Sequence, residues 1–409
     1  MPWMETVAVE QRMRFIADCQ DGELSMAALC RKYGISRRVG YKWLDRYRQE
    51  GVEGLKDRSR APHRHPSEVP AEIEAAIVAA RARHPTWGPK KLLVWLQRKQ
   101  PARRWPARST IAEILDRQGL TVPRKRRRRV WPQQDPFSAC EGPNSVWCAD
   151  FKGWFRTGEG RRCDPLTISD AFSRYLLRCQ ALGKTDGPTA RPLFEAAFRE
   201  YGLPWAIRTD NGAPFASRAI AGLSELSVWW IKLGIRPERI KPGQPQQNGR
   251  HERMHLTLKA ETANPPAATL RRQQERFDTF RLEFNQDRPH EALGMATPAS
   301  AYVASERQYP EHLGEMEYPS GWAVRRVDSG RFRWRSENIF VSHVLHGELV
   351  GLEAVDGRHW RLWFGPLSLG VVDGHRKKLL TPREGRRAGL DAWLLGTSFR
   401  CAPGGPQEP

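Results

Sequence analysis

The chain has 409 residues and a formal net charge of +21, from 67 lysines and arginines against 46 aspartates and glutamates. This length predicts about two to four domains with ample material for buried cores. The basic excess is uneven, because residues 1–142 hold 29 basic and 16 acidic residues, whereas the other 267 hold 38 and 30. A basic front half indicates a polyanionic partner, usually nucleic acid, with a merely solvated basic surface as the alternative.

Cysteine usage and hydropathy exclude several classes of protein. The seven cysteines are odd in number and none forms a Cys-x-x-Cys pair, so we expect neither a disulfide framework nor a zinc knuckle. There is no run of 18 apolar residues and no apolar core of a secretory signal near the N-terminus, so we expect no contact with a membrane. These features predict a protein that stays in the cytoplasm, where the DNA of a bacterium would be.

Residues 1–55 carry the pattern of a helix-turn-helix domain. Ser25 and Ser36 each precede a helical pattern, and Gly34 lies in the turn between the two helices. The second helix has an inner stripe that recurs every four residues, Val39, Trp43 and Tyr47. Its outer face is basic, which is typical of a recognition helix, although a plain helical hairpin has the same pattern. The predicted DNA-contacting residues are Arg37, Arg38, Lys42 and Arg46.

Residues 56–70 form a predicted linker, and residues 71–120 a second helical module. His63 and His65 in the linker are expected to be surface residues, since no cysteine pair follows at zinc-finger spacing. The module shows two apolar faces and a capping-box pattern at residues 110–113. We expect a second, smaller helix-turn-helix or winged DNA-binding module, with a purely structural bundle as the alternative. The residues of its apolar faces are Ile73, Ile77, Val78, Leu92, Leu93 and Leu96.

A basic arm over residues 121–135 follows this module. It contains six consecutive cations, whose mutual repulsion favours an extended chain along phosphates. A solvated linker without a partner is the alternative. The cations, all predicted to bind DNA, are Arg124, Lys125, Arg126, Arg127, Arg128 and Arg129.

Residues 136–305 alternate between strand and helix patterns. Apolar runs at 145–151, 163–170 and 174–182 predict three strands, and residues 189–201 predict a helix that precedes a strand ending at Asp210. This order favours a mixed α/β sheet. In residues 316–382, period-two patterns punctuated by glycine predict a small all-β barrel. Its outward Arg and Trp residues could contact DNA or lie on half-buried strands. Residues 383–409 are rich in Gly, Pro and Arg and are expected to be a disordered tail.

Three acidic residues lie where a two-metal nuclease needs them. Asp150 lies in the apolar run 145–151, Asp210 ends the later strand, and Glu252 lies near the start of a helix after a Gln- and Gly-rich loop. Two carboxylates on strand ends and a third on a nearby helix can hold two divalent cations that catalyse displacement at a phosphate. On the helix, Glu252, His255 and Lys259 are predicted to share one face that suits a bound phosphate backbone. An ordinary amphipathic helix is the alternative.

Four segments together resemble bacterial insertion-sequence transposases with a DDE integrase core, in the superfamily of retroviral integrases. The segments are Trp147–Lys152, Ser169–Tyr175, Arg208–Gly212 and Pro245–Arg253. Asn285–Leu293, followed by Thr297 and Pro298, resembles the segment that closes such a core. The resemblance spans about residues 135–305 and implies a ribonuclease H-like fold.

The resemblance implies that Asp150, Asp210 and Glu252 are the catalytic residues and the ligands of two Mg²⁺ ions, for which Mn²⁺ can substitute. Lys259 matches the basic residue two turns after the glutamate, which contacts the DNA end. The implied function is that of a DNA transposase, which binds the terminal inverted repeats of an insertion sequence, cuts the element ends by metal-dependent hydrolysis and joins the 3′-hydroxyl to target DNA by transesterification. Pairing two double-stranded DNA ends implies a homo-oligomer, at least a dimer.

Two departures from the family pattern stand out. The stretch between Asp210 and Glu252 is longer than in compact relatives, so residues 217–234 are predicted to add a helix with Trp229 and Trp230 in the core. The N-terminus also lacks the His-His-Cys-Cys zinc module of the retroviral branch. Three other functions stay open: a catalytically silent domesticated transposase that only binds DNA, a ribonuclease or repair nuclease on the same fold, and a transcription factor based on the helix-turn-helix domain alone.

Overall fold

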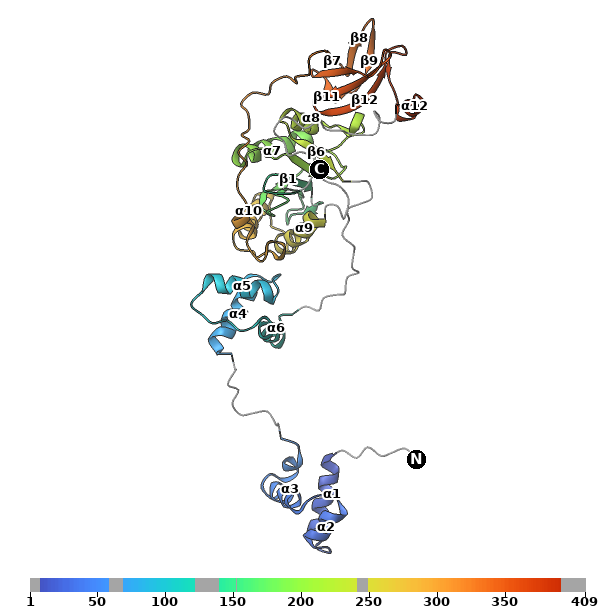
Figure 1. Cartoon of the computed structure of the whole chain (residues 1–409). Coiled ribbons are helices and arrows are strands. Elements are labelled where there is room, and N and C mark those ends of the chain that lie inside the picture. Colours follow the sequence, from blue (N-terminus) through green and yellow to red (C-terminus); the bar gives the residue numbers. More distant parts are fainter. Residues whose placement is uncertain (1–7, 59–68, 122–139, 152, 241–248, 391–409) are drawn as a thin grey trace. The chain divides into compact units, whose positions relative to one another are not determined.

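The computed structural model describes residues 8–58, 69–121, 140–151, 153–240 and 249–390. It forms two compact units, Met1–Val69 and Pro70–Pro409, whose helices and strands are labelled in Figure 1. The multidomain fold class is confirmed, since a helical region, a mixed α/β sheet and a small β-barrel follow one another along the chain. The two linker histidines, the cations at 124–129 and the loop before Gly249 lie outside the described residues.

The first unit is the predicted helix-turn-helix. It contains α1 (Ala8–Asp21), α2 (Met26–Lys32) and α3 (Arg37–Glu50), followed by a short 3₁₀ turn, η1 (Gly51–Leu55). Both predicted caps are present: the Ser25 hydroxyl accepts from the Ala28 N–H at 3.4 Å, and the Ser36 hydroxyl accepts from the Val39 N–H at 3.3 Å. The inner stripe of α3 packs into a core that the three helices and η1 share, formed by Phe15, Ile16, Leu29, Cys30, Trp43 and Leu55.

The second helical module consists of α4 (Ala71–Arg83), α5 (Pro89–Lys99) and α6 (Arg108–Arg117). Both predicted apolar faces contribute buried residues, among them Ile77, Leu92 and Leu96. The winged form of this module and the predicted capping box are both wrong. Residues 69–121, all of them described, contain no strand, so the module has no wing. The capping box at 110–113 is also absent, because α6 already begins at Arg108 and its N-cap residue, Ala107, has no side-chain acceptor.

A mixed sheet forms the centre of the second unit. The strand order is β4-β3-β1-β5-β6, and β2 pairs with the first residues of β3. The strands β4, β3 and β1 are antiparallel neighbours, whereas β1, β5 and β6 run parallel. This confirms the predicted mixed α/β sheet. The strands are β1 (Val146–Phe151), β2 (Phe155–Arg156), β3 (Arg162–Asp170), β4 (Leu176–Leu182), β5 (Ala206–Thr209) and β6 (Arg236–Arg239).

Helices cover both faces of this sheet (Figure 1). One face packs against α7 (Gly187–Tyr201) and α8 (Glu225–Lys232), in a core that includes Trp147, Ile168, Phe198 and Trp230. The other face packs against α9 (Gly249–Thr262) and α10 (Leu270–Gln286), through Leu176, Met254, Leu258 and Phe277. Since side chains alternate along a strand, Trp147 and Ala149 of β1 face α7, and Asp150 faces the α9 side. A short turn, η4 (Glu291–Leu293), and α11 (Pro298–Ala301) follow α10.

The predicted extra helix between the second and third acidic residues is α8, preceded by η2 (Ile220–Gly222). Trp229 and Trp230 are buried in the sheet core, as predicted. The opposite side of α8 contributes Val228 and Ile231 to the core of the β-barrel. The longer segment therefore joins the sheet to the barrel.

The C-terminal part of the second unit is a nearly closed antiparallel barrel with the strand order β13-β12-β11-β10-β7-β8-β9. An ion pair of 3.0 Å between Lys377, the residue before β13, and Glu337 of β9 links the two ends of this strand order. Trp334 and Trp363 are buried, so these tryptophans pack the barrel rather than contact DNA. The strands are β7 (Ala323–Asp328), β8 (Arg331–Trp334), β9 (Glu337–Phe340), β10 (Leu349–Ala354), β11 (His359–Phe364), β12 (Leu367–Asp373) and β13 (Lys378–Leu379), with η5 (His343–Leu345) between β9 and β10.

The predicted disorder from residue 383 is wrong for the first residues of that segment. A capped helix, α12 (Pro382–Arg387), begins after Thr381, and Leu390 is buried against Val371 and Leu380 of the barrel. Residues 391–409 lie outside the described part of the chain. In that described part, no helix is long and apolar enough to cross a membrane, and the six described cysteines are free.

Candidate active site

Asp150 and Asp210 lie at equivalent positions on neighbouring strands. Strand β1 pairs in parallel with β5, and Cys148 lies opposite Arg208. Each aspartate follows its member of this pair by two residues. Parallel strands end at the same edge of a sheet, so both carboxylates belong to one edge. The Asp150 side chain is 19% exposed, which leaves it accessible from that edge.

Hydrogen bonds define the turn after β5. The Asp210 carboxylate accepts from the Gly212 N–H at 3.1 Å, and the Asn211 side-chain amide donates to the Ile240 carbonyl at 2.6 Å. Just before the turn, the guanidinium of Arg208 pairs with Glu238 of β6 at 2.9 Å, and both side chains are nearly buried. Asp210 therefore lies between two residues, Arg208 and Asn211, whose side chains bind β6 or the residue that follows it.

Helix α9 presents Glu252 and Lys259 to solvent, while His251, Met254, His255 and Leu258 are buried. The prediction that His255 shares the exposed face of Glu252 and Lys259 is wrong. His255 is 2% exposed and lies against the sheet, where it cannot contact DNA directly. Glu252 and Lys259 are seven residues apart, roughly 10 Å along the helix axis.

A buried polar network joins α9 to the strand beside Asp150. Thr167 of β3 lies opposite Asp150 in the sheet and donates to the Asp150 carbonyl at 3.2 Å. The Thr167 hydroxyl also lies 2.7 Å from Nε2 of His251 and 2.6 Å from Nε2 of His255. Ser169 lies 3.0 Å from Nδ1 of His251.

The network ends at the carboxylate of Asp150, whose Oδ2 lies 3.7 Å from Nδ1 of His255. Burial lowers the pKa of His251 to about 3, so this ring is neutral at physiological pH. Sequence reasoning missed the network. Its signal is the pair of histidines four residues apart on one helix, facing hydroxyl residues two apart on one strand.

The structure brings together two of the three predicted acidic residues. Among the residues it describes, no group of three or more His, Cys, Asp and Glu side chains is placed to hold a metal ion. Glu252 belongs to the helix that packs beside Asp150, in the first turn after the loop that lies outside the described residues. The metal-binding role of the three acids therefore stays a prediction.

The predicted DNA-binding face of α3 is largely exposed. Arg37, Arg38 and Lys42 are solvent-exposed, whereas Arg46 is half-buried. The guanidinium carbon of Arg46 lies 5.1 Å from the centre of the Trp43 ring, a cation–π distance. Three of the four predicted DNA-contacting cations, Arg37, Arg38 and Lys42, are therefore exposed to solvent.

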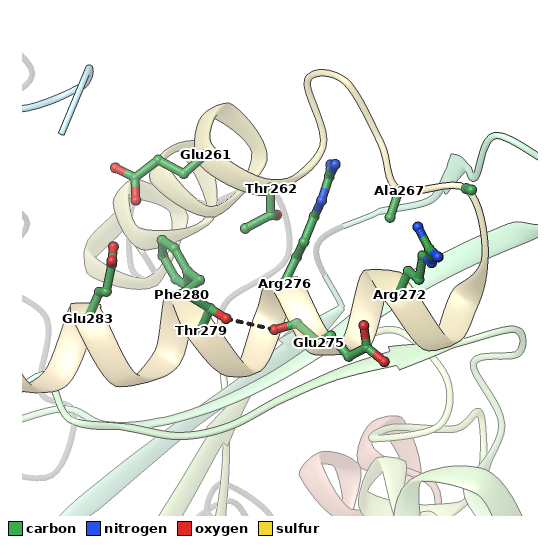
Figure 2. A pocket seen from close by; sticks show the side chains of 10 residues that line it. Glu261, Thr262, Ala267, Arg272, Glu275, Arg276, Thr279, Phe280 and Glu283 are labelled. Atoms are coloured by element: carbon green, nitrogen blue, oxygen red, sulfur yellow. Dashed lines mark hydrogen bonds between the residues drawn. The ribbon is translucent and has the colours of Figure 1, made fainter. Parts of the chain in front are cut away.

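Two cavities adjoin α9. The larger, about 590 Å³, lies between the end of α9 and α10. Figure 2 shows Glu261 of α9 and the charged side chains of α10 around it, Arg272, Glu275, Arg276 and Glu283. Glu261 in its wall lies nine residues after Glu252, roughly 14 Å along the helix, so this cavity is separate from the predicted acidic site. The smaller, about 340 Å³, is lined by Trp154 and Lys259 among others.

Protein-family models match several parts of the chain. Integrase core domain families match residues 141–245 and 233–298. A helix-turn-helix domain family matches residues 11–63, and a homeodomain-like family matches residues 39–115.

Two insertion-element proteins are similar in sequence. An uncharacterised 31.7 kDa protein of insertion element IS407 from Burkholderia multivorans is 30% identical over 191 residues, which cover 46% of this chain and 66% of the relative. An uncharacterised 39.2 kDa protein of insertion element IS476 from Xanthomonas euvesicatoria is 28% identical over 281 residues, 67% of this chain and 77% of the relative.

Solved retroviral structures are also similar. The HTLV-2 integrase catalytic core domain in complex with magnesium is 18% identical, with a TM-score of 0.30 over 40% of this chain and 99% of that one. A chain of the simian T-cell lymphotropic virus intasome, in complex with a regulatory subunit of PP2A, is 16% identical, with a TM-score of 0.36 over 75% of this chain and 100% of that one.

Proposed function

We propose that the chain is a DNA transposase, because it matches integrase core and helix-turn-helix domain families and is similar to proteins of two insertion elements. It binds the terminal inverted repeats of its element, hydrolyses a strand at each end and joins the freed 3′-hydroxyl to target DNA. The observation that supports this most is the equivalent placement of Asp150 and Asp210 at the ends of two neighbouring parallel strands.

Each predicted domain has its own role in this proposal. Residues 1–55 and 71–120 bind double-stranded DNA at the element ends, aided by the basic arm at 121–135. Residues 136–305 carry out the chemistry, and residues 316–382 form the barrel that α8 holds to the core. Pairing of two element ends requires at least a dimer.

The proposed metal ligands are Asp150, Asp210 and Glu252. Their carboxylate oxygens are the donor type that Mg²⁺ prefers, and two of the three already share a sheet edge. Two bound Mg²⁺ ions would supply charge stabilisation and activation of the attacking and leaving oxygens. The chain itself contributes strand ends that fix the two aspartates, a helix that presents Glu252, and Lys259 as an exposed cation for the phosphates of the DNA end.

The test is strand transfer with the element's own ends, taken from the DNA that flanks the coding sequence. Asp150→Asn, Asp210→Asn and Glu252→Gln should each abolish strand cleavage and transfer while end binding persists. Glu195→Gln is a matched control, since Glu195 lies on α7, which covers the opposite face of the sheet, and this variant should keep the parent's activity. Transfer by any of the three variants would disprove the assignment of that residue.

The same assays separate the alternatives. A silent, domesticated protein would bind the ends without metal-dependent cleavage in the parent. A general nuclease would cleave without protecting a site in footprinting. Lys259→Ala should weaken engagement of the DNA end, and parental affinity and activity in this variant would remove Lys259 from that role.

A further inference from the structure

The smaller cavity beside α9 carries an exposed aromatic residue that the proposed chemistry does not use. Trp154 is 56% exposed, although a tryptophan is usually buried in a soluble domain. It lies four residues after Asp150, just before β2, and lines the cavity of about 340 Å³ together with Lys259 of α9. The cavity's other walls are apolar in large part: Gly153, Phe155, Pro165, Leu258, Thr262, Ala263 and Phe277.

The surroundings of Trp154 are basic. The guanidinium carbons of Arg156 and Arg162 lie 5.7 Å and 5.5 Å from the centre of the indole ring, which are cation–π distances. Asp164 neutralises Arg162 in part, through an ion pair of 2.6 Å. Arg156, beside the indole ring, and Lys259, in the cavity wall, remain exposed cations.

We propose that Trp154 and this cavity bind one unpaired nucleobase at the end of a DNA strand. An aromatic face stacks on any base, and neighbouring cations attract the backbone phosphates, which is how proteins hold single-stranded nucleic acid. A cavity of this size lies at the small end of ligand sites, which span about 300–1,000 Å³, so it suits one base rather than a longer stretch. Helix α9 connects this cavity to the proposed acidic site, because it carries both Lys259 in the cavity wall and Glu252.

The inference rests on the proposed function, since its ligand is a DNA end. It adds that the terminal base pair is opened and that one base leaves the duplex. An unpaired base gives the strand end a fixed position beside the carboxylates, which a stacked terminal pair lacks. Opening one pair costs a few kcal/mol, and stacking on Trp154 would offset part of that cost.

The experiment uses the full chain and two DNA probes in buffer without divalent metal, so that no strand is cut. One probe is a blunt duplex of the element end, and the other is the same duplex with a short single-stranded 3′ extension whose last base is 2-aminopurine. The parent protein should quench the 2-aminopurine fluorescence and bind the extended probe more tightly than the blunt one. Trp154→Ala should lose the quenching and bind the extended probe about 5- to 150-fold more weakly, the range for one stacked base, while Trp154→Phe keeps both.

Trp205→Ala is the matched control. Trp205 is a second exposed tryptophan of the core, 37% exposed, with the Arg307 guanidinium carbon 4.2 Å from its ring centre. Its loss should leave quenching and affinity unchanged. Equal quenching by the parent and Trp154→Ala, or an equal loss in Trp205→Ala, would overturn the inference while leaving the transposase proposal intact. Conversely, quenching that depends on Trp154 in a protein whose acidic variants still transfer strands would support the base site and refute the assigned chemistry.

Discussion

Replacing Thr167 by valine tests whether the polar network supports the site. The two side chains have nearly the same shape, so the substitution removes a hydroxyl and leaves the packing in place. Thr167 is fully buried, and its hydroxyl contacts His251, His255 and the carbonyl of Asp150. In the valine variant, the Nε2 atoms of two histidines, which are 3% and 2% exposed, lose this partner.

The expected cost follows from these contacts. A buried polar atom left without a hydrogen bond costs about 1–3 kcal/mol, and the two rings share one site, so we expect a loss of about 2–4 kcal/mol. For a domain of this size, each kcal/mol lowers the melting temperature by about 2–4 °C. The core transition in calorimetry should therefore shift downward by about 5–15 °C. Strand transfer should fall as well, because Asp150 loses a neighbour that holds its backbone.

Thr157→Val provides the control. Thr157 is 4% exposed, and its hydroxyl oxygen has no hydrogen-bond partner in the structure. Removing a buried hydroxyl of this kind should leave stability unchanged or raise it slightly. If both valine variants melt like the parent, the hydroxyl of Thr167 does not stabilise the core. If both melt lower by the same amount, the effect comes from valine itself and the network argument fails.

Three further expectations follow from other contacts. The pKa of His251 is about 3 in the folded protein against 6.5 when unfolded, so only the unfolded state takes up a proton as the pH falls below 6.5. His251 should therefore cost about 2 kcal/mol of stability between pH 7 and pH 5. In His251→Gln, the free energy of unfolding should fall less steeply over this pH range, and a slope equal to the parent's would rule His251 out. Arg208→Ala removes the shorter of two ion pairs of the nearly buried Glu238 carboxylate, which keeps Arg236 at 3.3 Å. We expect a loss of about 1–3 kcal/mol in urea unfolding, and a stability equal to the parent's would contradict this. Gly40→Ala places a methyl group 2.6 Å from the sulfur of Cys30 and should destabilise the first unit by about 1–3 kcal/mol with loss of DNA binding, whereas parental melting of that unit would show that the contact relaxes freely.

Local chemistry explains which elements the sequence predicts well. Ser25 and Ser36 cap α2 and α3 because a serine hydroxyl before a helical pattern satisfies a backbone N–H that the helix leaves free. The strands that end near Asp150 and Asp210 are short apolar runs bounded by turn residues, and they form where predicted. The winged form of the module at 71–120 is absent because no strand pattern in that stretch supported it; the expectation rested on the type of module alone.

The error at His255 has a geometric origin. With about 100° of rotation per residue, His255 lies about 60° from Glu252 on one side and about 60° from the buried Leu258 on the other, at the boundary between the exposed and buried faces. Sequence periodicity cannot place a polar residue at such a boundary. The deciding contact comes from Thr167 on β3, 88 residues away in the chain, and no local pattern encodes it.

The boundary position of His255 also bears on how the site is held. An apolar contact between α9 and β3 would fix their separation but would let the helix slide or rotate, because dispersion and hydrophobic forces have little directionality. Hydrogen bonds from two successive turns of α9 to one threonine hydroxyl also fix rotation. Glu252 lies between these two histidines in the chain, and Asp150 lies opposite that threonine in the sheet. The contacts that set the helix against the strand therefore also set the relation between two of the proposed metal ligands.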